Sequence, residues 1–138
     1  MSIVTLEAYG SDFDVDAFLG RSPKVQVDTI WHRGDEGWRG EVIDSNGFRM
    51  TISDRDSSTE TIEHLDRFLR EAAGFINDLS ANRASVQINV GLFVGSDEHY
   101  TSSVSFTPAL LQAAAHLGVE LCVVGYPVSD EESDDLAP

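Results

Sequence analysis

The sequence predicts an α+β fold, with one mainly antiparallel or mixed sheet and helices packed on one of its faces. Strand-like and helix-like patterns follow one another in the order β-α-β-β-β-α-β-α-β. The strands alternate apolar and polar residues, whereas a doubly wound parallel sheet needs continuous apolar strands because both of its faces are buried. A chain of 138 residues suits one core, so we expect a single domain over 1–128 and an acidic, disordered tail over 129–138.

The chain opens with a strand, a short helix and a second strand. Residues 3–9 are rich in β-forming side chains, and Asp12 or Asp14 stands where it can cap the helix that follows. Gly20 ends that helix. Apolar and polar residues then alternate over 25–31, which predicts a strand with one apolar face.

A hairpin is expected next. Residues 38–43 and 48–53 read as its two strands, and they flank Asn46-Gly47. Asn and Gly both tolerate positive φ angles, which a two-residue hairpin turn requires, so this pair predicts the turn.

The longest helix follows the hairpin. Ser57 or Ser58 can cap it, and apolar residues recur at spacings of three and four as far as Leu79, with Gly74 as a point where the helix can break. Strict alternation over 86–92 then predicts another strand.

The last helix and strand have clear boundaries. Thr107 is a capping residue, Pro108 suits the first helical position, and Gly118 follows the end of the helix. An apolar run over 119–124 completes the sheet. The polar faces of the strands indicate a sheet that is open on one side, with exposed residues that include Gln26, Asp28, Arg49, Thr51, Gln87 and Asn89.

The charge of the chain restricts its partners. There are 24 acidic and 9 basic side chains, for a formal net charge of -15. Ordinary electrostatic binding to DNA, RNA or anionic membrane needs a basic surface, so these partners are excluded and a basic protein is favoured. Residues 1–20 and 84–138 contain no Lys or Arg at all. The acidity is therefore polarised along the chain, which suggests an interface.

The sequence favours a cytoplasmic location. Cys122 is the only cysteine, so an internal disulfide is excluded, as is typical of a reducing compartment. It lies in an apolar segment, which indicates a buried, inert thiol. The N-terminus lacks the basic start and apolar run of a secretory signal, and no apolar stretch is long enough to cross a membrane.

The search for catalytic chemistry finds no established motif. Asp12, Asp14 and Asp16 resemble the start of a calcium loop, but Ala17 and Pro23 stand where an EF-hand needs Gly and Glu, so helix capping explains these acids better. No nucleophile elbow, phosphate-binding loop or zinc spacing is present. We therefore expect no catalytic residues, no metal site and no cofactor.

One segment combines aromatic and charged side chains densely. Trp and Arg side chains are common at the centre of protein interfaces, and acidic side chains beside them can pair with a basic partner. We therefore take as candidate partner-binding residues Trp31, Arg33, Asp35, Glu36 and Trp38. The alternative is that the two Trp side chains fill one end of the core.

The order of these features resembles a small, widespread bacterial domain family of unknown function. The resemblance rests on Gly10 with Asp12-Phe13-Asp14, on Leu19-Gly20, on Arg33-Gly34-Asp35 with Trp38, and on the segment from Leu117-Gly118 to Tyr126. Gly125 stands where such domains tend to carry an Asp. Several families of this kind resemble immunity proteins, which bind and block a toxin made by the same cell. The resemblance implies no catalytic residues.

Three functions follow as expectations. The first is a non-catalytic, immunity-type inhibitor whose acidic surface docks on a basic toxin. The second is an enzyme or small-ligand protein with a cleft near the last helix, close to His99, Tyr100 or His116. The third is an interaction domain that forms a homodimer through its sheet.

Overall fold

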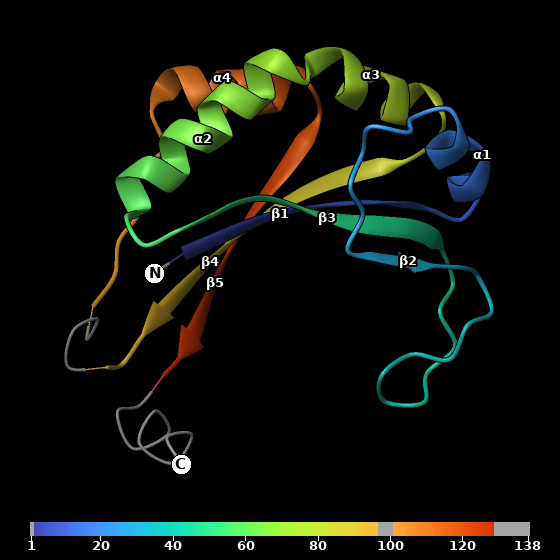
Figure 1. Ribbon diagram of the computed structural model, residues 1–138, viewed down its shortest axis with the longest axis horizontal. Coiled ribbons are helices and arrows are strands. Elements are labelled where there is room, and N and C mark those ends of the chain that lie inside the picture. The colour runs from blue at the N-terminus through green and yellow to red at the C-terminus, as the bar shows by residue number, and fades with distance from the viewer. Residues whose placement is uncertain (1, 97–100, 129–138) are drawn as a thin grey trace.

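The computed structural model describes residues 2–96 and 101–128, which form a five-stranded mixed sheet and four helices (Figure 1). The strands are β1 (Ser2–Gly10), β2 (Thr29–Trp31), β3 (Asn46–Arg55), β4 (Ser85–Val94) and β5 (Val119–Pro127). The helices are α1 (Val15–Gly20), α2 (Ser58–Glu71), α3 (Ala73–Ala81) and α4 (Pro108–His116). The tail expected over 129–138 lies outside the described residues.

The strand order is β2-β3-β1-β4-β5. β1 pairs antiparallel with both β3 and β4, and β2 pairs antiparallel with β3. β4 and β5 are parallel, and α4 lies between them in the sequence. Helices α2, α3 and α4 cover one face of the sheet, and within residues 2–96 and 101–128 the other face carries no helix (Figure 1). The predicted α+β class with a mixed sheet is confirmed.

The core lies between the sheet and the helices. Alternate residues of the central strand, Val4, Leu6 and Ala8, are fully buried beneath the helices. At one end of the core, four phenylalanine rings pack with centroid distances between 5.7 and 6.4 Å. They are Phe13, Phe18, Phe48 and Phe75. These rings fix α1 against β3 and α3, and so place the end of the molecule where the candidate site lies.

The predicted helix starts are confirmed by their side-chain hydrogen bonds. Asp14 accepts the backbone N–H of Ala17, and Thr107 accepts that of Leu110, both at 3.1 Å. Ser57, rather than Ser58, caps α2. The long helix is broken at Ala72, two residues before Gly74, so it forms α2 and α3.

The predicted hairpin turn at Asn46-Gly47 is wrong. Both residues belong to β3, and Gly47 pairs with Trp31 of β2 and with Tyr9 of β1. A Cβ atom at position 47 would lie 2.5 Å from both the Trp31 ring and the Ala8 carbonyl oxygen. Gly47 is therefore needed for the close approach of an aromatic ring to the sheet, and its conformational freedom at a turn is not used.

Three further expectations need correction. The strand predicted over 25–31 is reduced to the three residues of β2, preceded by an extended segment in which the Asp28 N–H donates to the Arg49 carbonyl at 2.8 Å. The predicted strand over 38–43 is replaced by one isolated bridge between Glu36 and Val42. Cys122 is half-buried rather than buried, since it lies in the last strand of the sheet.

Candidate functional site

The candidate site is the 32–45 loop, which joins β2 to β3 and projects from the sheet (Figure 1). Backbone hydrogen bonds connect its two arms: Gly34 N–H to Ile43 O at 2.8 Å, Ile43 N–H to Asp35 O at 2.8 Å, and Gly37 N–H to Glu41 O at 2.6 Å. A loop cross-linked in this way loses little conformational freedom when a partner binds to it.

Trp38 occupies the tip of the loop, and 89% of its surface is exposed. The Arg39 guanidinium lies 5.2 Å from the centre of the indole ring, in cation–π contact. The tip is shaped by Gly40, which has φ of +80°, and by the Glu41 carboxylate, which accepts the Arg39 backbone N–H at 2.8 Å. A large apolar side chain is thus presented to solvent on a defined backbone.

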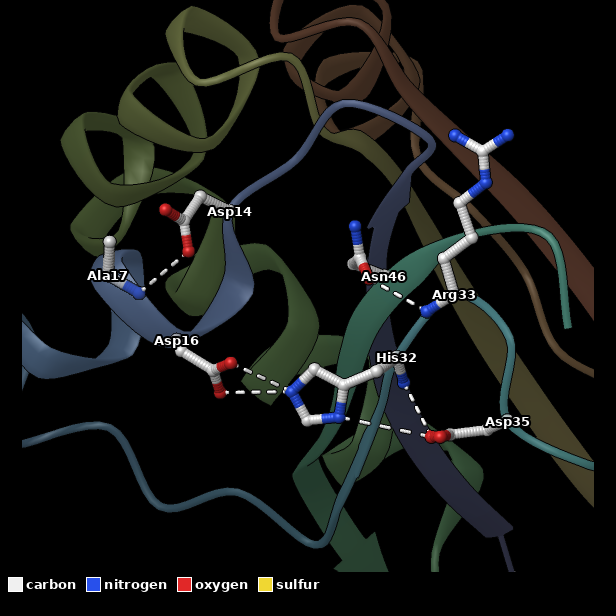
Figure 2. A network of polar contacts seen from close by, with 7 residues as sticks. All are labelled: Asp14, Asp16, Ala17, His32, Arg33, Asp35 and Asn46. Carbon is white, nitrogen blue, oxygen red and sulfur yellow. Dashed lines mark hydrogen bonds and ion pairs between the residues drawn. The ribbon is translucent and has the colours of Figure 1, made fainter.

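The base of the loop is held by His32 (Figure 2). Its Nε2 lies 2.8 and 3.1 Å from the two carboxylate oxygens of Asp16, the second residue of α1. A carboxylate only accepts, so Nε2 carries the hydrogen. Asp35 accepts the backbone N–H of His32 at 2.8 Å, and the same oxygen lies 3.8 Å from Nδ1. One imidazole thus connects the loop to α1, which is itself packed on the core.

Arg33 lies beside this network without joining it through its side chain. Its backbone N–H donates to Asn46 Oδ1 at 2.8 Å, which ties the loop to the start of β3. The guanidinium points away from the carboxylates of Asp16 and Asp35 (Figure 2). Arg33 therefore contributes an exposed positive charge to a mostly acidic area.

A shallow hollow of about 270 Å³ lies between α1 and the loop. Its walls include Asp12, Asp14, Asp16 and His32. Asp14 is used as the helix cap and Asp16 pairs with His32. Among residues 2–96 and 101–128, no group of three or more His, Cys, Asp or Glu side chains is arranged to hold a metal ion.

The structure brings four of the five predicted site residues together on the loop. Trp31 is separate from them, because it belongs to β2, is half-buried, and donates its Nε1–H to Ser45 Oγ at 3.4 Å. Its ring lies over Gly47. Of the two Trp side chains, Trp31 fits the interpretation as a packing residue, and Trp38 does not fill the core.

Sequence reasoning missed two parts of this site. Asp16 and His32 come from different elements, and no motif in the sequence links them. Two more apolar side chains, one on the loop and one on β2, are exposed: Val42 at 75% and Ile30 at 46%. Ile30 and Val42 lie in the two segments predicted as strands, 25–31 and 38–43.

The open face of the sheet holds a second hollow, of about 380 Å³. One part of it is polar, with Thr5, Asp28, Arg49, Thr51 and Asn89, and another part is apolar, with Ile3, Phe93 and Tyr126. Thr51 donates to Asp28 at 2.7 Å, and Arg49 donates to Thr29 at 3.3 Å. The expected polar, uncovered sheet face is confirmed at Asp28, Arg49, Thr51 and Asn89.

The chain was compared with family models, with curated proteins and with solved structures, and none of the three comparisons finds a match. The resemblance to a bacterial domain family therefore stays a prediction. Within the described part of the chain, none of the helices has the length and apolar character to span a bilayer.

Proposed function

We propose that this chain is a non-catalytic binding protein whose 32–45 loop docks on a basic protein partner. In its specific form the proposal is an immunity-type inhibitor, in which the partner is a toxin and the loop covers the toxin's active site. The observation that carries the proposal is Trp38, which is exposed at 89% on a loop closed by backbone hydrogen bonds. Trp is among the residue types that contribute most to binding energy at protein interfaces.

The charges around the loop support a basic partner. Acidic side chains lie on the loop itself and beside its base, at and just before the start of α1: Asp35, Glu36, Glu41 and Asp44, and Asp12, Asp14 and Asp16. Only Arg33 and Arg39 oppose them within these segments. Such a field accelerates association with a positively charged protein and weakens as salt is added.

The test uses the chain as an immobilised bait for proteins from the cells that produce it. We expect a basic protein to be retained by the wild type and released by raised salt. Trp38→Ala and Asp35→Lys should each lose this protein. Glu63→Lys makes the same charge change on the exposed face of α2, far from the loop in sequence, and should retain it.

The inhibitor form of the proposal has a separate readout. The retained protein should show a toxic or enzymatic activity that the wild-type chain suppresses and Trp38→Ala does not. A partner that binds all four proteins equally, or whose binding is unaffected by salt, would contradict the docking surface proposed here.

A second candidate function is the binding of a small ligand on the open face of the sheet. The observation that favours it is the hollow of about 380 Å³ with a polar and an aromatic part. His116, which the sequence suggested for a ligand cleft, is instead exposed at the end of α4, and His99 and Tyr100 lie outside the described residues. Ligand-observed NMR with a fragment mixture tests this function, and fragments that still bind equally to Asn89→Trp, which fills the hollow, would contradict it.

A further inference from the structure

The two edges of the sheet are built very differently. β2 is a strand of only three residues, and its long following loop folds back on itself. β5 has nine residues, all paired on one side with β4 in an unbroken register from Val119 to Pro127. Among the described residues, no strand pairs with the outer edge of β5 and no loop donates a backbone hydrogen bond to it. An unpaired strand of this length is a template for another strand.

The composition of β5 does nothing to prevent such pairing. Natural edge strands are usually protected by Lys side chains, by bulges, by proline within the strand or by very short length. Glu120 is the one charged side chain of β5, and Pro127 stands only at its last position. The strand also contains four apolar residues of high β-propensity, Val119, Val123, Val124 and Tyr126.

The exposed apolar side chains of the molecule fall into two groups. Ile30, Trp38 and Val42 belong to β2 and the 32–45 loop, at one side of the sheet. Leu111, Val123 and Tyr126 are each nearly half exposed and belong to β5 or to α4, the helix that contacts β5 (Figure 1). The second group is separate from the proposed partner surface, because β2 and β5 are at opposite ends of the strand order.

We propose that the outer edge of β5 pairs with β5 of a second copy of this chain. The two strands would run antiparallel about a twofold axis through Val123, the central residue of β5, and would join two sheets into one of ten strands. In an antiparallel pair, directly opposite residues have side chains on the same face. The twofold axis therefore keeps the helices of both copies on one side.

This register is self-complementary. Val123 lies opposite the partner's Val123, and Cys122 lies opposite the partner's Val124. Glu120 lies opposite the partner's Tyr126, so the only charge of the strand meets a phenol that can donate a hydrogen bond rather than a second carboxylate. A strand with one acidic group and no basic group offers little to the basic partner proposed above, and a second copy fits it better.

The net charge of -15 on each copy opposes association, and salt reduces this repulsion. The dimer should therefore be favoured by added salt, whereas the complex with a basic partner is weakened by it. The two proposals respond to salt in opposite directions, so that either can fail without the other.

Sedimentation velocity over a range of concentrations tests the dimer. The wild type should be a dimer in moderate salt, and Val123→Lys should be a monomer because two ammonium groups would face each other at the centre of the seam. Val123 is 48% exposed, so the monomer should remain folded, as judged by circular dichroism. Val42→Lys places the same charge on an exposed valine of the 32–45 loop and should stay dimeric. A wild type that remains a monomer at every concentration, or a Val123→Lys variant that still dimerises, would overturn the proposal.

The register has its own test. Opposite Cα atoms in an antiparallel pair lie about 4.5–5.5 Å apart, which a disulfide can span. Val123→Cys in a Cys122→Ser background should form a disulfide-linked dimer on mild oxidation, and Val42→Cys in the same background should not. Equal cross-linking of the two variants would contradict pairing through β5.

Discussion

Replacing Trp38 with alanine should leave the stability of the fold nearly unchanged. About a tenth of the Trp38 surface is buried, because 89% is exposed. A Trp side chain has an accessible surface of roughly 250 Å², so folding removes about 25 Å² of it from water. At about 25 cal/mol per Å², this burial stabilises the fold by about 0.6 kcal/mol. The contact with Arg39 adds about 0.5–1 kcal/mol. We expect Trp38→Ala to lower the free energy of unfolding by no more than about 1.5 kcal/mol.

Phe18→Ala is the matched control for this variant. Phe18 is 1% exposed and lies within 6.3 Å, centre to centre, of the Phe13, Phe48 and Phe75 rings. Its truncation should cost about 3–5 kcal/mol, as other buried aromatic truncations do. Urea unfolding followed by far-UV circular dichroism measures both changes on one scale. A cost for Trp38→Ala as large as that for Phe18→Ala would refute the view that Trp38 is free for a partner.

Three further substitutions test local features of the fold, each by urea unfolding. Gly47→Ala should destabilise the protein by more than about 1 kcal/mol and change the fluorescence of Trp31. The reason is that the new methyl group meets the indole ring and the Ala8 carbonyl. An unchanged fluorescence spectrum would contradict the contact between Trp31 and Gly47. Ser57→Ala should cost about 1 kcal/mol while Ser58→Ala costs little, since only Ser57 caps α2; equal costs would contradict this assignment. Gly118→Ala should cost about 1–2 kcal/mol of stability because the φ angle of Gly118 is +71°. Gly20→Ala, at the end of α1, should be neutral or stabilising. A larger loss of stability for Gly20→Ala than for Gly118→Ala would contradict these backbone conformations.

Local sequence signals predicted the helix starts and most of the sheet. Asp14 and Thr107 are caps because their oxygen atoms reach nearby backbone N–H groups, and this chemistry depends only on neighbouring residues. Alternation in β4 identified its buried face for a similar reason, since a strand with one covered face needs every second residue apolar. These features require no knowledge of distant contacts.

The hairpin error shows where local reasoning fails. Asn46-Gly47 has the composition of a tight turn, but the Trp31 ring and the β1 backbone both need the space above Gly47. The chain reverses further back, at Gly37 and Gly40, where Gly40 N–H donates to the Gly37 carbonyl at 3.0 Å. A tertiary contact therefore decided the role of the glycine, and no pattern within the segment could reveal it.

The candidate site was found only in part for the same reason. Trp38 and Asp35 could be named because aromatic and charged residues are close together in the sequence. The contact between Asp16 and His32 depends on how α1 packs against the core, and its side chains join elements separated by an irregular segment. The isolation of Trp31 likewise follows from its strand pairing.

The most direct test of the proposed function is the affinity of the retained basic partner for Trp38→Ala, measured by isothermal titration calorimetry. If Trp38 is a main anchor, its loss should cost about 2 kcal/mol or more, which is roughly a 30-fold rise in Kd. Leu111→Ala, which removes an exposed apolar side chain from α4, should leave Kd unchanged. A Trp38→Ala variant that binds the partner as tightly as the wild type would contradict the proposal that the 32–45 loop is the docking surface.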